Sequence, residues 1–226
     1  MRNFNKMKRE ETIQRIRDEK LVVIVRGVER DRLIPFAEAV YEGGVRLLET
    51  TFDASGRISD EQTAENIRML VDHFGERMLV GAGTVLTEEQ VELTARAGGC
   101  FIISPDTDAD VIRKTRELGL VSMPGALTPS ECKQAYRAGA DFVKLFPADN
   151  LGPAYLKALS APLSHIPFLA VGGVEPDNIA AYMKAGAVGF GVGSKIASKP
   201  LIQNGDYLAI RDLAAAYVDA IREGQR

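Results

Sequence analysis

The stretch DFVKLF (Asp141–Phe146) is an apolar run interrupted by one lysine, and runs of this kind decide the fold. Similar runs of four to six residues, nearly continuous in apolar side chains, recur along the chain. Strands that are covered by helices on both faces have this pattern, because neither face meets water. The other expected strands are Leu21–Val25, Val45–Glu49, Met78–Ala82, Phe101–Ser104, Leu120–Pro124, Pro167–Val171 and Val188–Val192.

Amphipathic segments that read as helices separate these strands. Thr87-x-x-Gln90 and Thr128-x-x-Glu131 are capping boxes that mark two helix starts, and glycines precede most of the following strands. Eight strand–helix units in this length predict one closed (β/α)8 TIM barrel over residues 1–226. The segment 1–20 is expected to be an extra helix that caps the barrel floor. An open doubly wound sheet is the rival, but Arg26-Gly27-Val28 after the first strand is not the GxGxxG of that fold.

The composition of the chain indicates which kinds of partner and which cellular compartment to expect. The chain has a formal net charge of −3, so no strong field favours nucleic acid or an anionic membrane. No apolar run reaches the roughly 18 residues of a membrane span, and the charged start lacks the core of a signal peptide. Cys100 and Cys132 form no CxxC motif. We therefore expect a cytoplasmic protein without nucleic-acid or membrane partners.

Three charged residues fall at or in the expected strands on one side of the barrel: Arg26, Glu49 and Lys144. Parallel barrels carry their active sites at the carboxyl ends of the strands. A desolvated lysine loses its proton more easily and becomes a nucleophilic amine, and a neighbouring carboxylate can relay protons. With an arginine to hold an anion, this set suits imine chemistry on a 2-keto acid.

These three residues also have readings without chemistry. Lys144 and Glu49 could form a structural ion pair across the barrel, and Arg26 could be a solvated rim residue. An ion pair would account for Lys144 and Glu49 without catalysis, because a buried charge costs several kcal/mol unless it is paired or neutralised.

Two glycine-rich turns follow the last two expected strands. They contain Gly172 and Gly173 in one turn and Gly193 and Ser194 in the other. Glycines let backbone N–H groups approach a phosphate, and the loops after strands 7 and 8 of a barrel are a recurrent phosphate site. A phosphate subsite is therefore predicted, although tight turns alone would also explain the glycines.

Seven motifs, in order, are similar to those of the 2-keto-3-deoxy-6-phosphogluconate (KDPG) aldolase family. They are GGVRLLETTF (43–52), VGAGTVLT (80–87), FIISPDTD (101–108), MPGALTPSE (123–131), VKLFPA (143–148), AVGGVEPDN (170–178) and GVGS (191–194). The family also includes 4-hydroxy-2-oxoglutarate (KHG) and 2-keto-3-deoxy-6-phosphogalactonate aldolases. The resemblance runs from about Leu21 to Ile196, which is nearly the whole expected barrel.

The resemblance implies a Schiff-base aldolase that releases pyruvate and glyceraldehyde 3-phosphate, or pyruvate and glyoxylate from 4-hydroxy-2-oxoglutarate. It implies Lys144 as the Schiff-base lysine and Glu49 as the general acid/base. The resemblance also assigns residues that line the pyruvyl pocket, namely Thr84, Pro105 and Phe146, and residues that hold the phosphate, namely Gly172, Gly173, Gly193 and Ser194. It further implies a homotrimer that needs no metal and no cofactor.

Two positions depart from the gluconate-type pattern. Asp53 stands where many members have an arginine that helps to hold the substrate carboxylate, and Arg26 is expected to take over that contact. Val171 stands where gluconate-type members have threonine, as in the galactonate branch. Altered selectivity between the two C4 epimers is therefore expected, because one hydrogen bond to the substrate is lost.

Other classes remain open from the sequence. A zinc-dependent aldolase needs several imidazoles, and the only histidines are His73 and His165, neither of them at an expected strand end. A magnesium site of carboxylates stays open, although Glu49 has no obvious acidic partner except Asp53. A sugar-phosphate isomerase or epimerase would share the phosphate end without an imine. A non-catalytic trimer that binds sugar phosphates would leave Lys144 inert.

Overall fold

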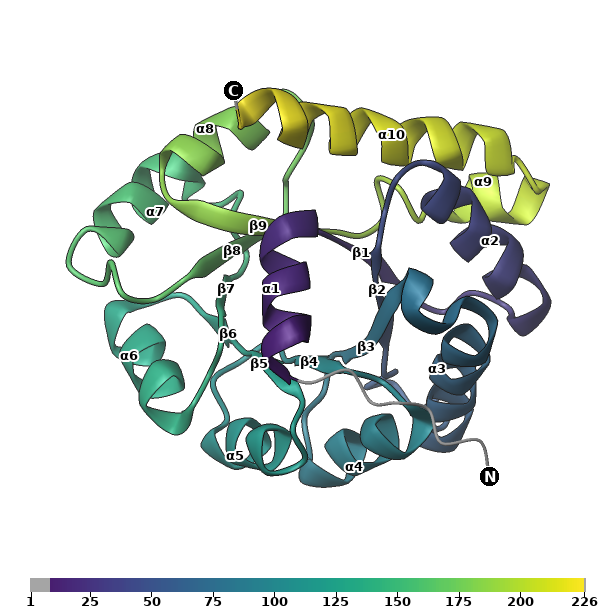
Figure 1. The fold of residues 1–226 in the computed structure, drawn as a ribbon, viewed down its shortest axis with the longest axis horizontal. Helices are drawn as coiled ribbons and strands as arrows, with labels where there is room; N and C mark the ends of the chain where they lie inside the picture. Colours follow the sequence, from purple (N-terminus) through teal and green to yellow (C-terminus); the bar gives the residue numbers. More distant parts are fainter. Residues whose placement is uncertain (1–8, 226) are drawn as a thin grey trace.

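Nine parallel strands form one sheet in the computed structural model, which describes residues 9–225 (Figure 1). The sheet order is β5-β4-β3-β2-β1-β9-β8-β7-β6. The strands are β1 (Leu21–Val25), β2 (Leu47–Thr51), β3 (Leu79–Gly83), β4 (Phe101–Ile103), β5 (Val121–Met123), β6 (Gly125–Ala126), β7 (Val143–Leu145), β8 (Phe168–Val171) and β9 (Ala187–Val192).

The two ends of this sheet meet at Pro124, which separates β5 from β6. β5 pairs with β4 and β6 pairs with β7, so the pair acts as one barrel strand. Proline has no N–H group to donate to a ladder, which explains the break. The single strand expected over Leu120–Pro124 is thus wrong in detail. The predicted (β/α)8 barrel is confirmed, and the open-sheet alternative is wrong.

Helices cover the outside of the strands on all sides (Figure 1). They are α2 (Arg30–Glu42), α3 (Asp60–Phe74), α4 (Glu88–Ala97), α5 (Ala109–Glu117), α6 (Pro129–Ala138), α7 (Gly152–Ser160), α8 (Ile179–Lys184), α9 (Lys199–Asn204) and α10 (Tyr207–Gly224), with a 3-10 turn, η1 (Gly75–Arg77), after α3. The capping box of Thr128 and Glu131 at α6 is complete. At α4, Thr87 caps the backbone of Gln90, but the Gln90 side chain accepts from Leu86 instead, so that box is half formed.

An extra helix, α1 (Arg9–Glu19), lies across one mouth of the barrel (Figure 1). Its Ile16 is buried in the cluster inside the barrel, with Leu47 and Phe142 among its members. Arg9 forms an ion pair with Asp141, just before β7, so α1 closes the amino-terminal end of the strands. The expected capping helix is confirmed over Arg9–Glu19, while its part over 1–8 lies outside the described residues.

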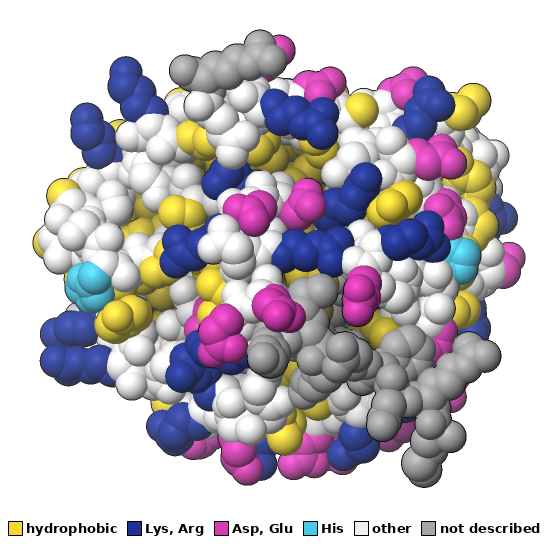
Figure 2. Space-filling view, in the orientation of Figure 1, with side chains coloured by type: hydrophobic (Ala, Val, Ile, Leu, Met, Phe, Trp, Pro, Cys, Tyr) yellow, Lys and Arg dark blue, Asp and Glu magenta, His cyan; other side chains and the backbone are white. Residues whose placement is uncertain are grey.

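The barrel floor has a mixed surface. Figure 2 shows this face, where basic and acidic side chains are interspersed around α1. No helix within residues 9–225 is long and apolar enough to cross a membrane.

Candidate active site

Lys144 and Glu49 both point into the barrel. Successive side chains of a strand alternate between its two faces, and Leu47 of β2 and Phe142 before β7 belong to the cluster inside the barrel. Glu49 and Lys144, each two residues further on, therefore face the interior as well. They are 2% and 7% exposed. Pairing with Ile24 and Gly81 places Glu49 in the middle of β2, and not at its end as the sequence suggested.

Burial changes the protonation of both groups in opposite directions. Loss of solvent raises the pKa of Glu49 to about 7, although the charges of Lys144 and Arg26 oppose this rise. Burial lowers the pKa of Lys144, Glu49 partly offsets the change, and Arg26 lowers the pKa further. The site thus favours a neutral amine beside a carboxyl group that can gain or lose a proton near neutral pH.

Lys144 and Glu49 interact without forming an ion pair. No N···O distance of 4.0 Å or less joins them, and Oε2 of Glu49 is buried without a hydrogen-bond partner among the described residues. A structural ion pair, the alternative to a catalytic role, is therefore not what holds these two groups in the barrel. A buried acceptor without a partner is rare in proteins and is left available to a ligand.

Gly83 makes room for the Glu49 carboxylate. It is the last residue of β3 and pairs with Thr51 of β2. A Cβ atom at Gly83 would lie 1.5 Å from Oε1 of Glu49, so no other residue fits there without moving the carboxylate. Sequence reasoning did not single out Gly83, although its place directly before Thr84 was a usable signal.

Arg26 and Thr84 contact each other at the carboxyl ends of β1 and β3. Nη2 of Arg26 donates to Oγ1 of Thr84 at 3.1 Å. Thr84 has a φ of 54°, in the left-handed region that a β-branched residue rarely adopts. Such strain is held where the surrounding structure fixes it, often at functional sites. The exposed Arg26 guanidinium thus has a fixed partner close enough to the site to affect the pKa of both Glu49 and Lys144.

Phe146 lies over Lys144, and Pro105 lies one strand away from it. The ring centroid of Phe146 is 4.5 Å from Nζ of Lys144, and this side chain is 39% exposed, so the ring covers the amine from the solvent side. Gly125 pairs with Lys144, and a Cβ there would lie 2.2 Å from the carbonyl oxygen of Pro105. Pro105 is therefore one strand away from the lysine. The structure places Phe146 over the Lys144 amine and Pro105 beside Gly125, the residue that pairs with Lys144.

A pocket of about 770 Å³ opens at the same end of the barrel, between the loops after β8 and β9. It brings together seven of the residues expected in the site, namely Arg26, Phe146, Val171, Gly172, Gly173, Gly193 and Ser194. Glu49, Lys144, Thr84 and Pro105 do not line it. Phe146 connects the two regions, because it lines the pocket and covers Lys144.

Free backbone donors line this pocket. Gly172 and Gly173 have φ values of 98° and 64°, which glycine adopts without strain. Within the described residues, the N–H groups of Gly172, Gly173, Gly193 and Ser194 donate no hydrogen bond. Oriented backbone N–H groups in a concave turn form an anion-binding surface. The predicted phosphate subsite therefore has suitable geometry.

Sequence reasoning missed four charged residues that line the pocket: Asp149, Glu175, Lys195 and Lys199. Nζ of Lys195 lies 2.7 Å from Oε1 of Glu175. Lys195 directly follows the GVGS motif, and Glu175 lies inside the AVGGVEPDN motif, two residues after Gly173, which was a usable signal. Their contact joins two loops that are separate in the sequence.

Asp53 has a structural role in the loop after β2. Its carboxylate accepts hydrogen bonds from the backbone N–H groups of Ser55, Arg57 and Ile58 and from the Ser55 hydroxyl. These bonds lower the pKa of Asp53 to about 2. The carboxylate holds the loop that leads to α3.

The two histidines lie away from the barrel mouth. His73 contacts Glu38 on the outer helices, and His165 stacks edge-on against Tyr136. No group of three or more His, Cys, Asp or Glu residues within 9–225 could hold a metal ion.

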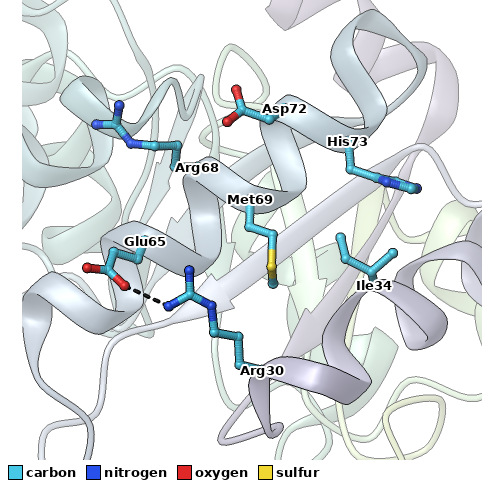
Figure 3. Close-up of a pocket in the computed structure, with 7 residues that line it drawn as sticks. All are labelled: Arg30, Ile34, Glu65, Arg68, Met69, Asp72 and His73. Carbon is cyan, nitrogen blue, oxygen red and sulfur yellow. Dashed lines mark hydrogen bonds and ion pairs between the residues drawn. The ribbon is translucent and has the colours of Figure 1, made fainter.

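A second cavity, of about 500 Å³, lies between α2 and α3 (Figure 3). Arg30 and Glu65 face each other there across 2.8 Å, and both side chains are more than half exposed. His73 lies at the other end of the groove. Its charges are ordinary solvated surface groups, so the barrel mouth is the candidate active site.

Comparison with known proteins agrees with this geometry. The family described as KDPG and KHG aldolase matches residues 12–213. The 2-dehydro-3-deoxy-6-phosphogalactonate aldolase of Escherichia coli K12 is 38% identical, over 90% of this chain and 95% of that protein. A solved structure described as native KDPGal has a TM-score of 0.81 at 38% identity, and the match covers 91% of this chain and 95% of that one.

A further solved structure shows the chemistry of a relative. The KDPG aldolase of Legionella pneumophila, with pyruvate captured as a covalent carbinolamine, has a TM-score of 0.80 and is 25% identical. The match covers 94% of this chain and 98% of that one. The chain belongs to the KDPG and KHG aldolase family, and it is an aldolase, an enzyme of the lyase class.

Proposed function

We propose that this chain is a metal-independent, Schiff-base aldolase that cleaves 2-keto-3-deoxy-6-phosphogluconate or its galactonate epimer to pyruvate and glyceraldehyde 3-phosphate. Cleavage of 4-hydroxy-2-oxoglutarate to pyruvate and glyoxylate is a second reaction of the same site. The observation that carries the proposal is Lys144, buried in an apolar barrel with a lowered pKa beside Glu49. The substrates of the relatives support the choice of sugar acid.

The proposed cycle starts at the Lys144 amine. The neutral amine attacks the 2-keto carbon, and the carbinolamine loses water while Glu49 supplies the proton that the leaving hydroxyl needs. The resulting iminium accepts the electron pair of the C3–C4 bond as Glu49, now ionised, takes the proton of the C4 hydroxyl. The aldehyde leaves, the enamine is protonated at C3, and water releases pyruvate and regenerates the amine.

The proposed binding contacts follow the observed positions. Arg26, held by Thr84, binds the substrate carboxylate, and Phe146 with Pro105 shields the imine from water. The free N–H groups of the two glycine turns bind the phosphate. Arg26 and the glycine turns line one pocket, which Phe146 connects to Lys144.

Trapping with borohydride tests the proposal. The protein incubated with pyruvate and borohydride should gain the mass of one reduced pyruvate, and peptide mapping should locate it on Lys144. EDTA should leave cleavage unchanged. A protein without an adduct would instead fit a sugar-phosphate isomerase or epimerase, or a non-catalytic binder. Homotrimeric assembly, a single domain over 1–226 and a cytoplasmic location stay predictions, and sedimentation equilibrium checks the first.

Gly83→Ala should lower kcat by about 100-fold, because the added Cβ would displace the Glu49 carboxylate from its working position. Gly81→Ala is the matched control on the same strand, since its Cβ would meet the ring of Phe101 and not Glu49. Gly81→Ala should lower the melting temperature and leave kcat close to that of the wild type. Steady-state kinetics and thermal unfolding of both variants separate the two effects. A wild-type kcat in the Gly83 variant would contradict the positioning role.

Val171→Thr should shift the ratio of kcat/KM for the two epimers towards the gluconate form by about tenfold or less. Val171 is 6% exposed and lines the pocket, so a hydroxyl there could bond to the substrate. One such bond contributes about 0.5–1.5 kcal/mol. Val171→Ala, which removes methyls without adding a hydroxyl, is the control. Coupled pyruvate detection with each epimer measures the ratio, and a strong gluconate preference in the wild type would contradict the premise.

A further inference from the structure

Lys195 and Glu175 bridge the two loops of the phosphate pocket. Glu175 follows Gly172 and Gly173 after β8, and Lys195 follows Ser194 after β9. Nζ of Lys195 and Oε1 of Glu175 are 2.7 Å apart, and both residues line the pocket. The pair therefore lies on the wall of the pocket that also carries the free N–H groups of the two glycine turns.

Hydrogen bonds hold the backbone at Glu175. The N–H of Glu175 donates to Oδ1 of Asn178 at 3.0 Å, and Nδ2 of Asn178 donates to the carbonyl of Gly173 at 2.9 Å. These bonds fix the backbone that carries the carboxylate. Lys195 is held by its head group, on a long stem with several rotatable bonds. Because that stem can rotate, the ammonium can reach a new partner without a change in the backbone at Glu175.

Little energy opposes that movement. The Lys195 side chain is 60% exposed and that of Glu175 is 44% exposed. Ion pairs this open to water contribute little, because solvent screens them and both side chains lose freedom. A phosphate on the N–H groups of Gly193 and Ser194 would place a larger negative charge beside the residue that follows them. Charge-assisted hydrogen bonds to phosphate are among the strong ones in proteins.

The charges of the pocket make a lysine contact useful. Its lining holds three basic side chains, Arg26, Lys195 and Lys199, and two acidic ones, Asp149 and Glu175. Arg26 is the proposed carboxylate ligand, so its charge is used at the other end of the substrate. The phosphate end then has two lysines against two carboxylates, and how Lys195 is shared decides whether a dianion is favoured.

We propose that Lys195 determines specificity for phosphorylated substrates: it rests on Glu175 in the free enzyme and moves to the phosphate when the substrate binds. Glu175 competes for the ammonium and repels the dianion, which weakens phosphate binding and eases release of the phosphorylated aldehyde. The inference rests on the proposed function, because it assumes that the phosphate occupies the glycine turns.

Aldol addition gives a matched pair of substrates for the test. Pyruvate is combined either with D-glyceraldehyde 3-phosphate or with D-glyceraldehyde, which differ only by the phosphate. Lys195→Met should lower the ratio of kcat/KM for the phosphorylated to the plain aldehyde by about tenfold, through KM. The inhibition constant of inorganic phosphate should rise with it. Lys195→Arg should restore most of the ratio, because the charge is retained.

Glu175→Gln distinguishes this role from a structural brace. If Glu175 competes for the Lys195 ammonium, Glu175→Gln should lower the KM for the phosphorylated aldehyde, whereas Lys195→Met should raise it. A brace between the loops would be lost in both variants, and both would then shift KM upwards, which would overturn the proposal. Lys133→Met, on the exposed surface of α6, should leave the ratio unchanged. If Lys199→Met lowers the ratio and Lys195→Met does not, the phosphate contact belongs to Lys199, and the proposal for Lys195 is overturned.

Trapping with pyruvate alone separates the two levels of the argument, since pyruvate carries no phosphate. A wild-type protein that forms no adduct with pyruvate and borohydride would defeat the proposed function itself. Normal adduct formation together with an unchanged aldehyde ratio in Lys195→Met would defeat the role of Lys195 and leave the aldolase intact.

Discussion

Lys144→Met should abolish the pyruvate adduct and lower the kcat of cleavage by about 10⁴-fold or more. The nucleophile is removed, and no other side chain of the barrel interior carries an amine within the described residues. Lys144→Arg keeps the positive charge but cannot form the imine, so it should be equally inactive. Trapping with labelled pyruvate and progress curves with each sugar acid measure both quantities.

Lys144→Met should also stabilise the fold. Burial lowers the pKa of Lys144, so the unfolded chain binds the proton more readily than the folded one. The destabilisation therefore develops as the pH falls below the pKa of the unfolded chain, and it is complete below the pKa that Lys144 has in the folded protein. Methionine has a similar volume without a charge, and a gain of about 1–4 kcal/mol is expected. Urea unfolding at pH 6 checks this.

Lys157→Met, on the exposed face of α7, is the matched control and should keep full trapping. An adduct that persists in Lys144→Met, or a variant that unfolds more easily than the wild type at pH 6, would show that the lysine is structural. Reactivity and stability are expected to change in opposite directions, as is common where an active site keeps a buried charge.

The barrel itself could be predicted from the sequence, because strands covered on both faces must be continuously apolar. The run Phe142–Phe146 showed Lys144 as an exception for the same reason. Hydrophobicity alone put Pro124 inside one expected strand, although a proline, which has no N–H group to donate to the ladder, was a usable signal for the break. It also placed Glu49 at a strand end, whereas pairing with the neighbouring strands sets its true place in the centre of β2.

The site could be predicted in its residue types but not in its contacts. The roles of Gly83 and of the Lys195–Glu175 pair depend on atoms brought together by different strands and loops. Asp53 is a similar case, because its hydrogen bonds to Ser55, Arg57 and Ile58 give it a structural role in the loop after β2 that the sequence did not show. Distances between loops are set by barrel closure, which a single sequence does not encode locally.

Glu49→Gln should lower kcat by about 10²–10⁴-fold, because glutamine cannot exchange the protons that imine formation and C3–C4 cleavage require. Since the pKa of Glu49 is about 7, the carboxylate that accepts the C4 hydroxyl proton forms as the pH rises through 7. Cleavage by the wild type should therefore rise between pH 6 and pH 8. This limb of the profile should be absent in the residual activity of the variant.

The stability of the fold should also follow the ionisation of Glu49, but it should fall, and not rise, as the pH increases. The pKa of Glu49 is raised from 4.5 to about 7 on folding, so the folded protein holds its proton more tightly than the unfolded chain. The resulting stability is complete below pH 4.5 and is lost as the pH rises through 7. One pKa unit corresponds to about 1.4 kcal/mol, so the loss is about 3 kcal/mol.

Glutamine does not titrate, so Glu49→Gln should be more stable than the wild type at pH 8 and about equal to it at pH 4.5. Urea unfolding at both values, beside cleavage rates from pH 5 to pH 9, measures the two effects in one variant. Glu89→Gln, at an exposed position of α4, should change neither. Equal stability of wild type and Glu49→Gln at pH 8 would mean that the carboxylate is not desolvated, and the proton relay assigned to it would lose its physical basis.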